Sequence, residues 1–305
     1  MKLILVVALC ILALLYIVVL GWNARRSGQG LELDNRWRPS PHQLLIGFVT
    51  NFFDTLGIGN FAPTTAWFRF AKLVPDELIP GTMNVGHTLP VMLMGFLFIG
   101  IVEVEPITLF CMIGSAILGA WVGAGIVSKL PKNRVQIGLG SALVAAAVLM
   151  AAFQFENLKP EGNEALGLEL PWLVFACIVI GVLGALMTIG VGLYAPCMIL
   201  VSLLGMNLIA AFPIMMGACA FLMPFASTRF VLSGKFRMQA ALGLTLGGLP
   251  AVLIAALLVK SLPLYWLKWM VVVVVFLTAI LMLRAAFATG GRDQESSLVE
   301  KKLNS

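Results

Sequence analysis

The sequence predicts an all-α polytopic membrane protein made of two inverted repeats. Broken, re-entrant helices from the two repeats are expected to meet near the membrane midplane, and one extra N-terminal transmembrane helix precedes the repeats. Three observations predict this class: the composition, the series of apolar segments, and a duplicated glycine and proline pattern. Of the 305 residues, 60% are apolar and only 11% are charged, and the mean hydropathy is +1.01. Soluble domains carry about 25% charged residues, because their surface needs polar cover. This composition excludes soluble enzymes, disordered chains, collagens and disulfide scaffolds.

The charge and the metal-ligating residue types favour neither a nucleic-acid partner nor a bound metal. The net charge is +6, which in a soluble protein could indicate nucleic acid but in a membrane protein holds cytosolic loops in place. The five cysteines show no C-x-x-C spacing, and His42 and His87 stand alone, so no metal site is expected. No phosphate-binding loop of the G-x-x-x-x-G-K-[ST] type is present. We therefore expect no cofactor, no metal and no nucleic acid.

Nine apolar segments follow one another along the chain. A membrane core of about 30 Å needs about 20 helical residues. The first segment is expected to be an uncleaved anchor, because Arg25 and Arg26 follow it directly and the small-residue cleavage site of a signal peptide is lacking. The segments are 3–22, 44–70, 79–102, 107–128, 135–153, 171–204, 208–231, 239–260 and 264–287.

Two of these segments, 44–70 and 171–204, are interrupted by similar glycine and proline patterns. Gly57-Ile-Gly-Asn-Phe-Ala-Pro63 lies 133 residues before Gly190-Val-Gly-Leu-Tyr-Ala-Pro196, and the same spacing carries Pro80 to Pro213. The chain therefore divides into an anchor with a basic cytosolic linker, a first repeat, an acidic external loop that runs into the second hairpin, a second repeat and a charged cytosolic tail. Their ranges are 1–43, 44–153, 154–176, 177–287 and 288–305.

The distribution of positive charge favours inverted repeats. If every segment crosses the membrane, the best orientation places 12 of the 20 Lys and Arg residues in the cytosol; if the two interrupted segments enter and leave on one side, it places 16 there. The second arrangement fits the positive-inside rule better. Each repeat then crosses an odd number of times, the N-terminus lies outside and the C-terminus lies in the cytosol. The alternative, that glycine and proline only kink ordinary spanning helices, remains open.

The two interruptions have the residues of an anion site. Proline is favoured in the first turn of a helix, so Pro63 and Pro196 are expected to start second half-helices of about 14 residues, which is about 21 Å. Glycine permits the tight turn before them, and each half-helix N-terminus offers free N–H groups and a positive dipole end. The candidate substrate-binding residues are Gly57, Gly59, Asn60, Phe61, Pro63, Thr64, Thr65, Gly190, Gly192, Tyr194 and Pro196.

Ionisable and polar residues inside apolar segments are candidates for proton coupling or gating. Asp54 could carry a proton, cap the break or pair with Arg69. His87 could face the site or be a hydrogen-bonded structural residue, and Arg229 could guide anions or anchor the topology. The candidates are Asp54, Asn84, His87 and Arg229.

These patterns resemble the sulfite exporter TauE/SafE family of permeases. The openings at Gly57–Pro63 and Gly190–Pro196 match its glycine runs, and the closings at 118–131 and 247–263 match its small-residue helices with a Leu-Pro turn. Segment 3–22 is an addition, and Asn60 and Leu193 replace a family glycine. The resemblance implies transport of sulfite, sulfonates or other organic acids across the inner membrane, mostly outward.

The predicted function is therefore a secondary transporter, an exporter of a small anion, that works by alternating access around the two breaks and is not an enzyme. Its partners are the anionic solute and the lipid bilayer, with a homo-oligomer left open. Two alternatives are a membrane-embedded enzyme, with Asp54 and His87 as its only candidate pair, and a structural subunit of a membrane complex.

Overall fold

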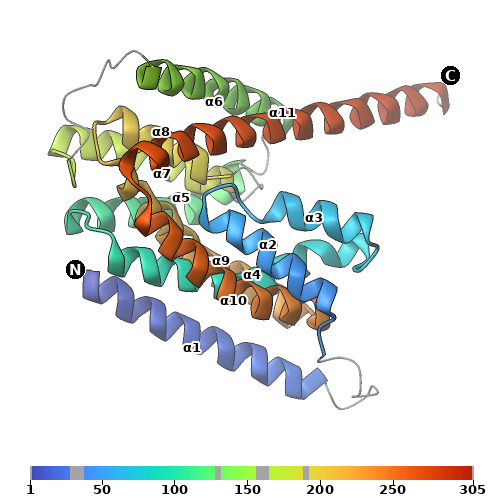
Figure 1. Cartoon of the computed structure of the whole chain (residues 1–305). Coiled ribbons are helices and arrows are strands. Elements are labelled where there is room, and N and C mark those ends of the chain that lie inside the picture. Colours follow the sequence, from blue (N-terminus) through green and yellow to red (C-terminus); the bar gives the residue numbers. More distant parts are fainter. Residues whose placement is uncertain (1, 28–37, 128–131, 156–164, 188–191, 304–305) are drawn as a thin grey trace.

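The computed structural model describes residues 2–27, 38–127, 132–155, 165–187 and 192–303, and these are nearly all helical (Figure 1). The one β-bridge in this part of the chain joins Ala165 to Met206. The helices are α1 (Lys2–Ser27), α2 (Pro41–Thr55), α3 (Phe61–Phe70), η1 (Asp76–Leu78), α4 (Ile79–Ile101), α5 (Pro106–Val127), α6 (Lys132–Phe155), α7 (Leu170–Met187), α8 (Tyr194–Leu203), η2 (Leu208–Ala210), α9 (Ala211–Ser233), α10 (Met238–Ser261) and α11 (Leu264–Leu303).

The coarse prediction, an all-α polytopic membrane protein, is confirmed. Within the described residues, 7 helices are long and apolar enough to cross a membrane. The extra N-terminal helix α1 is the most apolar of them and leaves most of its surface exposed, as lipid contact requires. The charged tail is helical as far as Leu303, because α11 continues through it.

Both interrupted segments break where glycine and proline were found. In the first, α2 ends at Thr55 and α3 begins at Phe61; in the second, α7 ends at Met187 and α8 begins at Tyr194. The second half-helices α3 and α8 have 10 residues each, not the expected 14, so each rises about 15 Å. They are shorter because the break itself consumes residues of the apolar run.

Each broken segment folds back so that its two ends adjoin. In the first hairpin, α2–α3, Trp67 Nε1 donates a hydrogen bond of 3.0 Å to His42 Nε2. In the second hairpin, α7–α8, the backbone N–H of Asn207 donates to the carbonyl of Ala165 at 2.9 Å. The residues that flank each hairpin therefore lie close together.

Helices α4 and α9 pack against each other at the centre of the molecule and run in opposite directions. Gly81 lies against Lys235, Gly95 lies against Ala220, and Thr88 hydrogen-bonds Ser227 between these points. The outer helices pack against helices from the other half of the chain: α10 packs on α2, and α5 packs on α7. Helices α6 and α11 form a further pair that lies across one side of the bundle (Figure 1).

Glycine allows the outer helix pairs to approach closely. A Cβ at Gly119 on α5 would collide with the backbone of Gly181 on α7, and a Cβ at Gly247 on α10 would collide with the carbonyl of Leu44 on α2. Small residues at such contacts are how membrane helices gain packing energy without a hydrophobic driving force.

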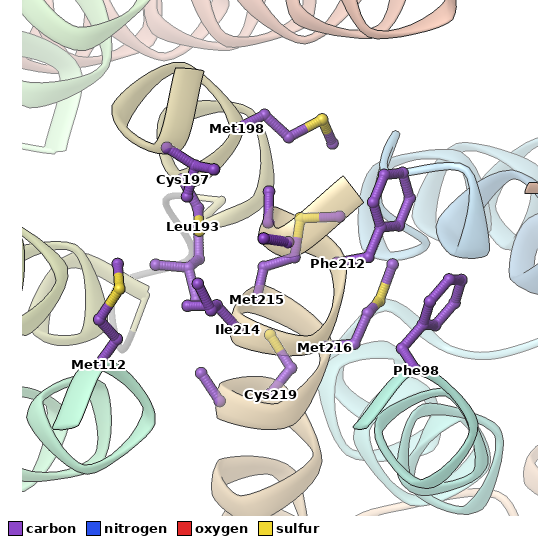
Figure 2. Packing of buried hydrophobic residues seen from close by; sticks show 14 of the residues in the cluster. Phe98, Met112, Leu193, Cys197, Met198, Phe212, Ile214, Met215, Met216 and Cys219 are labelled. Atoms are coloured by element: carbon purple, nitrogen blue, oxygen red, sulfur yellow. The ribbon is translucent and has the colours of Figure 1, made fainter. Parts of the chain in front are cut away.

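The main buried cluster surrounds α8 and α9 and is rich in sulfur (Figure 2). The rings of Phe98 and Phe212 stack there with centroids 5.2 Å apart. The same cluster contains Met112, Cys197, Met198, Met215, Met216 and Cys219. Flexible thioether side chains fill irregular gaps well, and the two breaks require such gaps to be filled.

Charged residues divide between the two ends of the bundle. One end, here called the basic end, carries exposed Arg38, Arg69, Lys72, Lys235 and Arg237, together with the exposed carboxylates Asp76 and Glu77. It is held together by hydrogen bonds from Gln239 Nε2 to the carbonyl of Arg38 at 2.8 Å and from the Arg237 N–H to Thr82 Oγ1 at 2.9 Å. The opposite end, here called the acidic end, carries Glu103, Glu105 and Glu169, with the Glu105 N–H donating to the carbonyl of Leu166 at 2.7 Å.

Candidate functional site

The first break is a tight turn whose backbone conformation requires glycine at two positions. Gly57 has φ +101° and Gly59 has φ +89°, backbone conformations that only glycine adopts without strain. The Gly57 N–H donates to the carbonyl of Asp54 at 2.8 Å, which closes the end of α2. Helix α3 then starts after Asn60, and Pro63 lies in its first turn as expected.

Asp54 closes this break from inside the protein. Its carboxyl is 1% exposed and accepts a hydrogen bond of 2.8 Å from Asn60 Nδ2. Arg69, the other partner considered from sequence, pairs instead with Asp76, with Nε and Oδ1 3.1 Å apart. Of the structural roles considered for Asp54, the structure therefore has the bond across the break and not the Arg69 pair.

His87 on α4 joins three helices through both ring nitrogens. Its Nδ1 lies 3.1 Å from Asn51 Oδ1 on α2, and its Nε2 lies 3.0 Å from Thr64 Oγ1 on α3. Asn51 Nδ2 donates to the carbonyl of Gly47 at 2.7 Å, so its oxygen is the acceptor for an Nδ1–H of His87. The unprotonated Nε2 then accepts from the Thr64 hydroxyl.

A proline-induced defect in α4 lies beside His87. Pro90 has no N–H, so the carbonyl of Gly86 loses its helical partner. Thr245 Oγ1 on α10 donates to this carbonyl at 2.7 Å and satisfies it. Sequence reasoning missed Thr245, since only the missing N–H of Pro90 marks the need for a donor and nothing local names it.

The threonine and aromatic candidates of the first half-helix also have defined contacts. Thr64 is fully buried, and the Thr65 hydroxyl donates to the carbonyl of Phe61 at 2.8 Å within α3. The ring of Phe61 lies 6.2 Å from the ring of His87, centroid to centroid.

The second break is described from Gly192 onward, and Gly190 lies outside the described residues. Leu193 precedes α8, and Pro196 occupies its first turn, matching the first break. Tyr194 interacts electrostatically with Asp54 and lies close to Cys219 on α9, whose thiol donates to Met187 Sδ at 3.7 Å. Cys219 is a second site residue that sequence reasoning missed.

The first break contacts the second half-helix. A Cβ at Gly57 would collide with Met198 Cε on α8 and would contact Val274 on α11, so the first turn lies directly against the second half-helix. By contrast, a Cβ at Gly59 or at Gly192 would meet no heavy atom within 4 Å. These two glycines occupy matching places in the duplicated pattern, and open space lies beside both.

Two gating candidates lie away from the turns. Asn84 Nδ2 donates to the carbonyl of Pro80 at 2.9 Å within α4. Arg229 is exposed on the last turns of α9. Between them, Thr88 bonds Ser227, and this pair also interacts with the hydroxyl of Tyr16 on α1.

The family of the chain follows from a comparison with family models. The model described as "Sulfite exporter TauE/SafE" matches residues 103–282, more than half of the chain. The chain belongs to the TauE/SafE sulfite exporter family. The match covers the second hairpin, and the first hairpin precedes it. No significant match was found among the curated proteins or among the solved structures. As a TauE/SafE family protein with seven membrane-capable helices, the chain is a multi-pass membrane permease.

Proposed function

We propose that this TauE/SafE family protein is a secondary transporter that exports a small anion, such as sulfite, a sulfonate or another organic acid, across the cell's inner membrane. The observation that carries the proposal is the contact of the first break with the second half-helix at Gly57 and Met198, together with the open space beside each of the matching glycines Gly59 and Gly192. A small solute needs such space, and duplicated breaks at the centre of a membrane bundle are typical of transporters.

The chemistry of the breaks suits a negative charge. Helices α3 and α8 begin at the breaks, so free backbone N–H groups and a positive dipole end lie at each break. Helix N-termini bind anions without a cationic side chain, which avoids the cost of burying a lysine or arginine in the membrane. Asn60 and Tyr194 add polar side chains at the two helix starts.

Alternating access would follow if residues 44–153 and 177–287 are inverted repeats. The close spacing of the residues that flank each hairpin supports this arrangement, as do the opposite directions of the equivalent helices α4 and α9. The exchanged pairing of α10 with α2 and of α5 with α7 also supports it. Two equivalent halves of opposite orientation can form the same site open to either side of a membrane.

The charge distribution sets the proposed orientation. By the positive-inside rule the basic end faces the cytosol. Lys2 Nζ donates to the carbonyl of Val102 at 2.8 Å, beside the acidic end, so the N-terminus would lie outside. Helix α11 follows α10 at the acidic end, so in the proposed orientation its charged C-terminal part would lie in the cytosol.

The enzymatic alternative gains nothing from the geometry. Asp54 bonds Asn60, whereas His87 bonds Asn51 and Thr64, so neither has the other as its hydrogen-bond partner. A nucleophilic or acid–base pair would need a direct contact or one bridging water.

Flux of ³⁵S-labelled sulfite in liposomes containing the purified protein tests the proposal. Asn60→Ala and Tyr194→Ala are expected to lose most of the flux, because each removes a polar group at a half-helix start. Tyr265→Ala is the matched control, since Tyr265 is 59% exposed. Wild-type flux in both break variants, with normal insertion, would remove the site from the breaks.

A further inference from the structure

We infer that Asp54 binds the proton that accompanies the transported anion, so that proton and anion bind together and cross in the same direction. The inference rests on the function proposed above and adds the coupling ion and the sign of its coupling. It starts from position: Asp54 is on the last turn of α2, and its carboxyl bonds the Asn60 amide at the start of α3. The carboxyl group of Asp54 thus lies between the C-terminal end of α2 and the first residues of α3.

Among the residues that the structure describes, none supplies a compensating cation to Asp54. In the part of the chain that the structure describes, the single ion pair joins Arg69 to Asp76. The titratable groups that interact with Asp54 are Tyr194 of α8 and Cys219 of α9, and neither is cationic.

The other helices packed around this break carry their charged residues away from it, and on α11 these include Arg284, 10 residues after the Val274 that Gly57 approaches. Helix α3 has Arg69 in its last turn, α10 has Lys260 in its last turn, and α11 has Lys268 near its start. On α4 the nearest ionisable residue is His87, whose ring bonds Asn51 one turn before Asp54.

A bound anion and an ionised Asp54 would therefore oppose each other. The open space beside Gly59 begins one residue from the Asn60 amide that holds the carboxyl. Two negative charges in one poorly solvated site cannot both be retained at low cost, and one of them takes up a proton. The carboxylic acid form of Asp54 removes the repulsion and can donate a hydrogen bond to the anion.

His87 is not suited to this role. Its neutral ring is already satisfied as a donor to Asn51 and an acceptor from Thr64. A second proton at Nε2 would replace the hydrogen bond from the Thr64 hydroxyl by a buried positive charge. His87 is therefore a positioning residue that holds α2, α3 and α4 together, and Asp54 is the proton carrier.

The coupling has a definite electrical consequence. A monoanion that moves with one proton carries no net charge, and a dianion that moves with one proton carries one negative charge. An inside-negative membrane potential therefore drives a dianion outward even with its proton, while a proton gradient directed inward opposes that movement.

The test uses the full-length protein in liposomes loaded with sulfoacetate, a dianion whose charge is constant near neutral pH, and with a luminal pH dye. The membrane potential is held at zero with potassium and valinomycin. Efflux of sulfoacetate is expected to make the lumen alkaline, because each anion removes a proton. A pH gradient of one unit is expected to hold an anion concentration ratio of about tenfold at equilibrium.

Asp54→Asn is expected to abolish both the pH change and the tenfold ratio, while sulfoacetate still raises its melting temperature. Asp76→Asn is the matched control, since this carboxylate is exposed and pairs with Arg69, and it is expected to retain both effects. Proton movement that persists in Asp54→Asn would overturn the assignment. Should that variant not fold, the wild-type protein still decides, because efflux that leaves luminal pH unchanged or acidifies it also overturns the assignment. A wild-type protein that moves neither sulfoacetate nor sulfite would instead overturn the proposed function.

Discussion

The hydrogen bond from Thr245 to the carbonyl of Gly86 gives a quantitative prediction for stability. Replacing Thr245 by valine keeps the shape of the side chain and removes its donor. The carbonyl was already deprived of its helical partner by Pro90, so the variant leaves it with none. An unsatisfied buried polar group costs about 1–3 kcal/mol, but hydrogen bonds between membrane helices average about 0.6 kcal/mol and reach about 1.7. The expected loss is therefore about 1 kcal/mol.

The chain contains a matched control for this substitution. The hydroxyl of Thr278 on α11 is the one buried side-chain polar atom without a hydrogen-bond partner among the described residues. Thr278→Val makes the same chemical change where no bond exists, so it is expected to be neutral or stabilising.

Thermal unfolding in detergent measures both variants. A loss of about 1 kcal/mol lowers the melting temperature of a chain of this size by about 2 °C. The expected order of stability is Thr278→Val at or above wild type and Thr245→Val below it. Equal melting temperatures for the two variants would show that the carbonyl of Gly86 does not depend on Thr245.

Three further variants test the packing around the breaks. Gly57→Ala is expected to lose more stability than Gly59→Ala. Both glycines have positive φ, which costs alanine about 1 kcal/mol or more, but only a Cβ at Gly57 would also collide with Met198. Equal losses in thermal unfolding would contradict this. His87→Ala is expected to cost about 2–4 kcal/mol, since two buried hydrogen bonds are lost and their partners are left unpaired; a variant as stable as wild type in the same assay would show that His87 does not join the three helices. Tyr16→Phe removes the hydroxyl that donates to the carbonyl of Val85 at 3.1 Å and is expected to cost about 1 kcal/mol, whereas unchanged unfolding would argue that α1 is held by lipid and apolar contact alone.

The positions of the breaks could be predicted because particular backbone conformations require particular residue types. Gly57 and Gly59 have the positive φ values that only glycine adopts freely. Pro63 and Pro196 lie in first helical turns, where a missing N–H has no cost. Both rules are local, and the duplicated pattern carries the same residue types in both halves of the chain.

The polar contacts that join the helices could not be predicted in the same way. Asn51 and His87 are 36 residues apart, and Thr245 and Gly86 are 159 residues apart. Which side chain reaches which carbonyl depends on how the helices cross, and that is fixed by packing over the whole bundle. The half-helix length was overestimated for a related reason, since an apolar run does not show how many of its residues the turn consumes.

The two half-helices occupy unlike surroundings. Helix α8 buries seven of its residues and packs against α6 and α11, whereas α3 buries only Thr64 and Phe68 and packs against α2 and α4. The two halves share an architecture, but their hairpins are covered unequally. Helices α6 and α11 pack on the second hairpin, and α3 of the first hairpin is mostly exposed or half-buried. If the two halves alternate as proposed above, the α6–α11 pair would move from the second hairpin to the first, so a cysteine bridge between α3 and α11 would form only in that second state.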